Sequence, residues 1–159
     1  MKPTSIRAAA FGIGVVAGLR SLTAPAILAW AAHRKYTRLR MPVAGVLTSK
    51  ISRRAIKLAA GELLADKLPL TPNRINPGPL AARLVSGAAC GAALSWAVKA
   101  PWNEGAALGA AGAVAGAFGG YYARKHLSKS RSTLAVALVE DAVAIGTGIA
   151  VVATVARAT

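Results

Sequence analysis

Four of the five acidic residues stand in largely apolar stretches, where a carboxylate could bind or relay a cation or a proton. Glu140 and Asp141 are adjacent and lie inside the apolar run Leu134 to Ala156, while Glu62 and Asp66 are spaced by four. As a helix, this run of 23 residues would be about 35 Å long, which exceeds the ~30 Å hydrocarbon core of a bilayer. A carboxylate inside the bilayer needs a cationic partner or a wet cavity, so we predict that these acids form a binding or transport site.

Two arginines in other apolar stretches offer the opposite charge. Arg20 stands near the middle of residues 8–32, where an unpaired guanidinium is most costly, so we expect it to pair with a buried acid. Asp141 is the expected partner, because it lies on a helix face of small residues where a neighbouring helix packs. Arg83 is expected either to approach Asp66 or to extend towards the headgroups, and the same extension is the alternative for Arg20.

The composition indicates a membrane protein with a strongly basic surface. Hydrophobic residues make up 55% of the chain, and the mean hydropathy is +0.48. Twenty Lys and Arg stand against five Asp and Glu, but the basic residues lie between long apolar runs and aromatic residues are few. This pattern disfavours nucleic acid and predicts contact of the basic loops with anionic lipid headgroups.

The order of apolar and basic segments predicts an all-α, polytopic membrane domain over residues 1–159, with four clear spans and a shorter second helix. The expected helices cover residues 8–32, 49–68, 80–98, 105–123 and 134–156. Residues 69–79 hold four of the eight prolines and are expected to form a stiff loop. Pro25 is expected to kink the first helix, for which a cleaved signal peptide is the alternative. The first half of the helix at 49–68 carries four basic residues, so the sequence leaves open whether this helix crosses the bilayer.

Glycines spaced by four predict close contacts between helix backbones, as in the GxxxG packing of membrane helices. The expected packing residues are Gly14, Gly18, Gly87, Gly91, Gly112, Gly116, Gly120 and Gly148. A weak internal repeat accompanies them, because residues 14–18 resemble residues 112–116 and each unit is followed by two acids. If five helices cross, the two units have opposite orientation, an arrangement found in many transporters; a duplication without a transport role is the alternative.

The motif Glu62-Leu63-Leu64-Ala65-Asp66-Lys67-Leu68-Pro69, together with Gly18-Leu19-Arg20-Ser21, Arg83 and Glu140-Asp141, resembles a bacterial membrane-protein family known as domain of unknown function 4126. The resemblance covers nearly the whole chain and implies a multi-pass protein of the bacterial inner membrane. It implies no activity, substrate or cofactor. The chain departs from the family in the helix before the motif, where Lys50, Arg53, Arg54 and Lys57 occur.

Motifs for enzymatic chemistry are absent from the sequence: there is no phosphate-binding G-x-x-x-x-G-K-[ST], no G-x-S-x-G and no cluster of metal ligands. We therefore expect a protein that is not an enzyme and needs no cofactor or metal. The expected function is a small, homo-oligomeric transporter or channel-like protein for an ion or a small or lipid-like solute, with Arg20 and the four acids as its site. The alternative is a membrane scaffold or lipid-organising protein whose buried charges are structural ion pairs.

Overall fold

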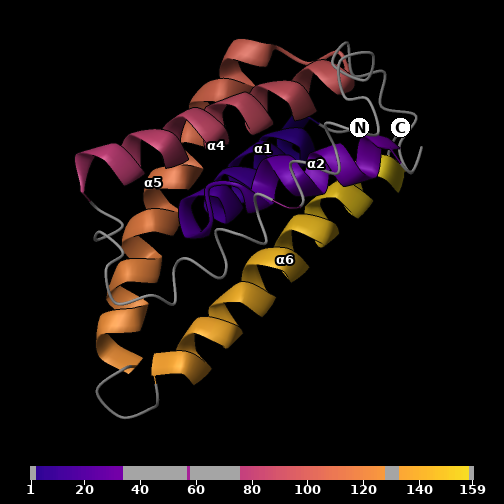
Figure 1. Cartoon of the computed structure of the whole chain (residues 1–159). Coiled ribbons are helices and arrows are strands. Elements are labelled where there is room, and N and C mark those ends of the chain that lie inside the picture. Colours follow the sequence, from indigo (N-terminus) through magenta and orange to yellow (C-terminus); the bar gives the residue numbers. More distant parts are fainter. Residues whose placement is uncertain (1–2, 34–56, 58–75, 128–132, 158–159) are drawn as a thin grey trace.

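The computed structural model describes residues 3–33, 57, 76–127 and 133–157. Within these ranges the chain forms helices and short connections and contains no strand, so the predicted all-α class is confirmed for this part (Figure 1). Apart from Lys57, the predicted second helix lies outside the described residues, and with it Glu62 and Asp66. The five helices of the described part are α1 (Pro3–Leu19), α2 (Thr23–His33), α4 (Pro77–Ala97), α5 (Trp102–Leu127) and α6 (Thr133–Arg157).

The first apolar stretch is not one helix, as the sequence suggested, but two helices separated by a break at Arg20. The amide of Arg20 still donates to the carbonyl of Val16, at 2.8 Å, and the next helix begins with Ala26 donating to Leu22, at 3.1 Å. The break therefore precedes the expected kink at Pro25. This proline lies in the first turn of α2, where a missing N–H costs no hydrogen bond.

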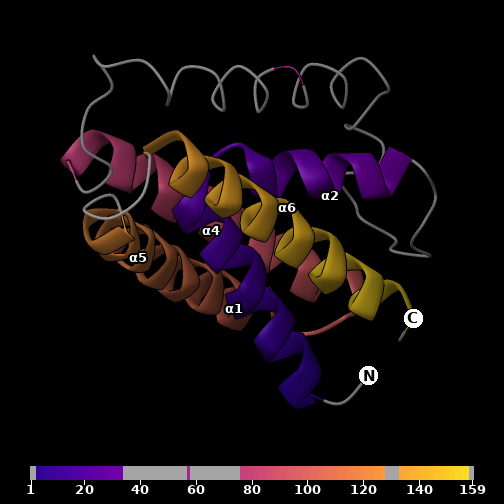
Figure 2. The same cartoon turned by 90° about the horizontal axis from the view of Figure 1, so that it is seen from below.

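Helix α2 runs back towards the end of the molecule where α1 begins, so α1 and α2 form a helical hairpin (Figures 1 and 2). Contacts with α6 agree with this arrangement, because Val16 of α1 and Ile27 of α2 both lie near Gly148. With 17 and 11 residues, the two helices are about 26 and 17 Å long, shorter than a ~30 Å hydrocarbon core. The predicted first span is therefore wrong as a single crossing helix.

Helices α1, α4 and α5 pack through glycines that bring their backbones into direct contact. A side chain on Gly14 would collide with the carbonyl of Gly109, and one on Gly87 would lie 2.6 Å from the same oxygen. This confirms the predicted packing role of the glycines in α1, α4 and α5 whose Cβ would meet a neighbouring backbone: Gly14, Gly18, Gly87, Gly91, Gly112 and Gly116. Gly148 instead packs against the side chain of Ile27. Gly105 and Gly109, which the sequence analysis did not single out, extend the α5 contact towards its N-terminus.

The two helices of the supposed repeat, α1 and α5, pack against each other in the same direction. Arg7 pairs with Glu104 near the start of both helices, at 2.5 Å, and Gly18 meets Gly116 further along both. The opposite orientation, which was expected if five helices cross, is therefore not found for α1 and α5. The reason is the hairpin, because α2 has already reversed the chain where the prediction had one continuous helix.

The remaining helices are slightly longer than predicted. Helix α4 begins at Pro77 rather than residue 80, since prolines fit the first turn of a helix, and Arg124 and Lys125 belong to α5 rather than to a loop. Helix α6 agrees with the prediction within one residue at each end.

Among the described helices, α4 and α6 are both long and apolar enough to cross a membrane. Only 33% and 28% of their apolar windows are buried, whereas a core helix of a soluble protein would be mostly buried. Large apolar side chains lie exposed along both helices, including Val85 and Trp96 on α4 and Val139 and Ile149 on α6. These exposed apolar faces favour contact with lipid over contact with water.

Candidate functional site

The candidate site is built around the break between α1 and α2. Breaking a helix leaves the last carbonyls of α1 without their usual N–H donors. Arg83 of α4 supplies donors, because its Nη1 group donates to the carbonyls of Gly18 and Leu19, at 2.6 and 2.8 Å. The hydroxyl of Ser86, one turn further along α4, donates to the carbonyl of Ser21 at 2.5 Å. Side chains of α4 thus cap the C-terminal end of α1 and stabilise the break between α1 and α2.

Arg83 itself is 4% exposed, so the suggested extension of its side chain to the headgroups is wrong. A guanidinium at the C-terminus of a helix also interacts favourably with the negative end of the helix dipole. The suggested approach of Arg83 to Asp66 stays a prediction, because Asp66 lies outside the described residues.

Arg20, at the break itself, forms a buried ion pair with Asp141 of α6, so the predicted pairing of these two residues is confirmed. The Nη2 group of Arg20 donates to Oδ1 of Asp141. The side chain of Arg20 is fully buried, and Asp141 is 9% exposed as a residue. The pair is therefore largely shielded from solvent, and it ties the turn of the hairpin to α6.

Glu140, next to Asp141, faces a different neighbour. Its Oε2 accepts a hydrogen bond from Nη2 of Arg124 on α5, at 2.7 Å. Adjacent residues of a helix point about 100° apart, which lets α6 direct one carboxylate to the hairpin and the other to α5. The two acids thus form two separate ion pairs that join three elements of the fold.

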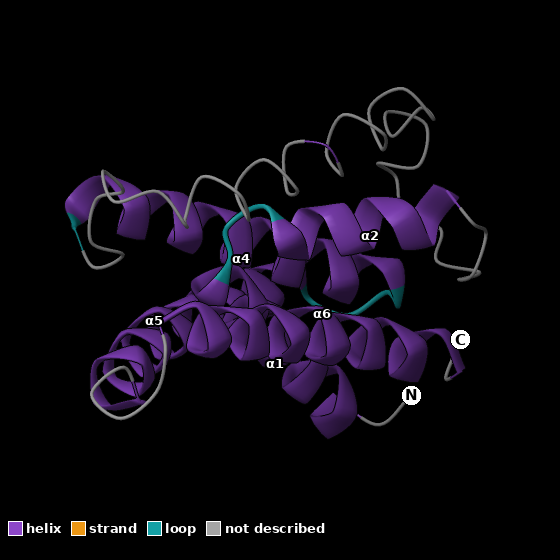
Figure 3. Cartoon of the chain, turned by 60° about the horizontal axis from the view of Figure 1, so that its bottom comes forward, coloured by secondary structure: helices purple, strands orange, loops and turns teal. Residues whose placement is uncertain are grey.

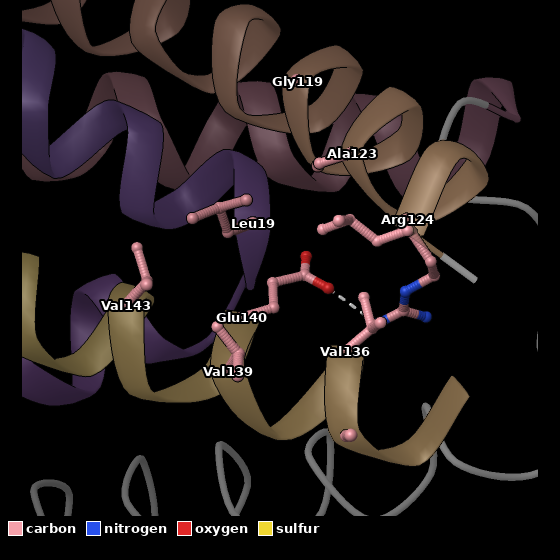
Figure 4. Close-up of a pocket in the computed structure, with 11 residues that line it drawn as sticks. Leu19, Gly119, Ala123, Arg124, Val136, Val139, Glu140 and Val143 are labelled. Carbon is pink, nitrogen blue, oxygen red and sulfur yellow. Dashed lines mark hydrogen bonds and ion pairs between the residues drawn. The ribbon is translucent and has the colours of Figure 1, made fainter. Parts of the chain in front are cut away.

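The Glu140–Arg124 pair lines a pocket of about 480 Å³ between the C-terminal part of α5 and the N-terminal part of α6 (Figure 4). Leu19, the last residue of α1, contributes to one wall. All other lining residues are Gly, Ala, Val or Leu, so the ion pair is the single charged feature of the described lining. An apolar pocket with one charged group is the usual form of a site for an amphipathic ligand.

The sequence prediction paired Arg20 with Asp141, and the structure brings these two residues together. Arg83 lies at the same break, whereas Glu140 pairs with Arg124. The sequence prediction did not identify Arg124, which was assigned to a basic loop cluster. A signal for Arg124 is present in the sequence, because it follows Gly116 and Gly120 at the same spacing of four and so continues the packed face of α5. Gly120 is buried and lines the pocket.

The described part of the chain is helical (Figure 3), with a short hairpin and two helices of membrane-spanning length. Its buried charged residues lie at the break of the hairpin and on α6. Comparison with known proteins adds no relative: no family model, no curated protein and no solved structure matches the chain. The resemblance to domain of unknown function 4126 therefore stays a prediction. In the described part of the chain, no group of three or more His, Cys, Asp or Glu side chains is arranged to hold a metal ion.

Proposed function

We propose that the protein is a small, multi-pass membrane transporter that binds an amphipathic solute in the pocket between α5 and α6. The observation that carries the proposal is the Arg124–Glu140 pair at 2.7 Å on the wall of an otherwise apolar pocket of about 480 Å³. Charged residues inside a membrane are expensive and commonly mark the path of a substrate or an ion. A short hairpin whose broken end is held by polar side chains is a further feature shared with transporters.

The two adjacent carboxylates of α6 suggest how binding could lead to movement. A solute group that binds Arg124 competes with Glu140 and so weakens the link between α5 and α6. Asp141 keeps α6 attached to Arg20 and therefore to the hairpin. Binding would thus release α6 on one side while the other side holds, which gives the two arrangements that alternating access requires.

The second candidate function is a scaffold or lipid-organising protein in which the ion pairs are structural. The observation that favours it is the shielded ion pair of Arg20, whose side chain is fully buried and does not line the pocket. In a scaffold, both ion pairs only fix the packing of α6, and no solute crosses the membrane.

A transport assay separates the two functions. The full chain is reconstituted into liposomes that contain phosphatidylglycerol with a fluorescent acyl chain, and dithionite then reports how fast the labelled lipid moves between leaflets. We expect the protein to accelerate this movement and Glu140→Gln or Arg124→Gln to abolish the acceleration. Glu104→Gln is the matched control, because Glu104 pairs with Arg7 far from the pocket. A rate equal to that of empty liposomes would refute transport of this lipid and favour the scaffold.

A further inference from the structure

We infer that the pocket between α5 and α6 is a binding site for an anionic membrane phospholipid, with Arg124 holding the phosphate and the apolar walls holding an acyl chain. The inference rests on the proposed function only in placing the ligand at the Arg124–Glu140 pair. It names the chemical class of the ligand and does not require that the ligand be transported.

The guanidinium of Arg124 has hydrogen-bonding capacity left for an anion. Its Nη2 group donates to Glu140, whereas its Nε atom is buried and has no acceptor among the described residues. The Arg124 side chain is 26% exposed, so a ligand can reach it, and a rotation of the guanidinium would turn Nε towards a phosphate oxygen. Arginine binds phosphate with two parallel hydrogen bonds. A zwitterionic headgroup carries the same phosphate, but its own cation offsets the negative charge that Arg124 would attract.

The charge around the pocket also favours an anion. Arg124 and Lys125 form the last turns of α5 together with His126, and the sequence continues with Lys129 and Arg131. Glu140 is the one acid in the described lining and is already paired. Clusters of Lys and Arg at the end of a membrane helix attract anionic lipid headgroups.

The walls of the pocket suit an acyl chain that enters from the bilayer. Its volume of about 480 Å³ falls within the ~300–1,000 Å³ range of ligand pockets. Val139 and Val143 line it and are 62% and 53% exposed, and Leu138 beside them is 51% exposed. The pocket is therefore continuous with an exposed apolar face of α6, so a lipid can reach it laterally with its headgroup at the basic end of α5 (Figure 4).

Two glycines on exposed helix surfaces provide a matched pair of variants. A Cβ at Gly119 or at Gly146 would meet no atom within 4 Å, so both positions accept a larger side chain without disturbing the packing. Gly119 lines the pocket and Gly146 does not. Gly119→Leu should therefore fill the pocket, whereas Gly146→Leu adds the same side chain, and the same gain in helix propensity, outside it.

The test measures lipid binding to the full chain in detergent by native mass spectrometry, with palmitoyl-oleoyl phosphatidylglycerol and phosphatidylcholine as probes and palmitate as a third arm. We expect the phosphatidylglycerol complex to be about tenfold more populated than the phosphatidylcholine complex, because the choline cation offsets the attraction of the phosphate to Arg124 and a difference of about 1.4 kcal/mol is a factor of ten. Gly119→Leu should abolish this binding and Arg124→Gln should remove the preference for phosphatidylglycerol. Gly146→Leu should bind like the wild type.

Several outcomes would overturn the inference. Equal binding of the two phospholipids would overturn it, and so would unchanged binding to a folded Gly119→Leu variant. Selective binding of palmitate with no phosphatidylglycerol bound would overturn it as well. Helix content from circular dichroism and the elution volume show whether each variant is folded, and Gly119→Val serves if the leucine variant is not. Binding of phosphatidylglycerol without any lipid movement in liposomes supports this inference and refutes only the proposed transport. Movement without selective binding refutes this inference alone.

Discussion

Neutralising one partner of the Arg20–Asp141 pair should destabilise the protein strongly, whereas neutralising both should restore much of the loss. In Asp141→Asn the fully buried guanidinium of Arg20 loses the charge of its described partner. Removing one member of a buried ion pair typically costs about 3–5 kcal/mol, because the other charge stays buried without compensation. Arg20→Met should cost a similar amount. Replacing both residues removes both charges of the pair, so we expect the double variant to be more stable than either single variant by about 2 kcal/mol or more.

The measurement is the free energy of unfolding of the four proteins in mixed detergent and dodecyl sulfate micelles, arranged as a double-mutant cycle. The pair Arg7–Glu104 serves as the internal control, since it has a similar geometry, at 2.5 Å, but its side chains are 55% and 39% exposed. An exposed pair contributes only about 0.2–1 kcal/mol, so its cycle should give a coupling energy in that range.

A coupling energy for Arg20 and Asp141 no larger than that of Arg7 and Glu104 would refute the reasoning. It would mean that the guanidinium at the break reaches water or another anion when Asp141 is neutral. A double variant less stable than both single variants would refute the reasoning as well. The ion pair would then stabilise the fold by more than the burial of its two charges costs.

Two further predictions concern the helix contacts. Gly109→Ala should destabilise the protein by about 1–3 kcal/mol, because the added methyl group would collide with the backbone of α4. The control is Gly119→Ala, whose added methyl group meets open space; this variant should leave the thermal unfolding midpoint unchanged or raise it. Equal midpoints for the two variants would contradict the close packing. Arg83→Met should lower the free energy of unfolding by about 1.5–3 kcal/mol, because the carbonyls of Gly18 and Leu19 lose a charged donor. Arg83→Lys should recover part of this loss. Equal stability of Arg83→Met and the wild type would contradict the capping role.

The sequence predicted the features of the fold that depend on local periodicity. The spacing of glycines identified the faces on which α1, α4 and α5 meet, because a spacing of four places residues on one side of a helix whatever the partner is. The extent of α6 was predictable for a similar reason, since its long apolar run contains no proline. The small-residue face of α6 also led to Asp141 as the partner of Arg20.

The helical hairpin was not predictable from local pattern. The apolar run continues through Arg20, and Pro25 is the stronger local signal for an irregularity. The break forms at Arg20 because Arg83 and Ser86, which are 65 positions away from their acceptors, satisfy the carbonyls that it frees. Arg124 was missed for a related reason: helix α5 continues into its basic end, so a residue that looked like part of a surface loop lies against α6.

The hairpin also sets an order for synthesis and insertion. Arg20 is made 121 residues before its partner Asp141, which at roughly 5–20 residues per second corresponds to a delay of about 6 to 24 seconds. The donors on α4 for the freed carbonyls arrive after about half that delay, since they follow by 65 residues. The α1–α2 segment is therefore made well before the described partners of its turn, and it forms these contacts only after α4 and then α6 have been made. The first helices to leave the ribosome are thus among the last to settle.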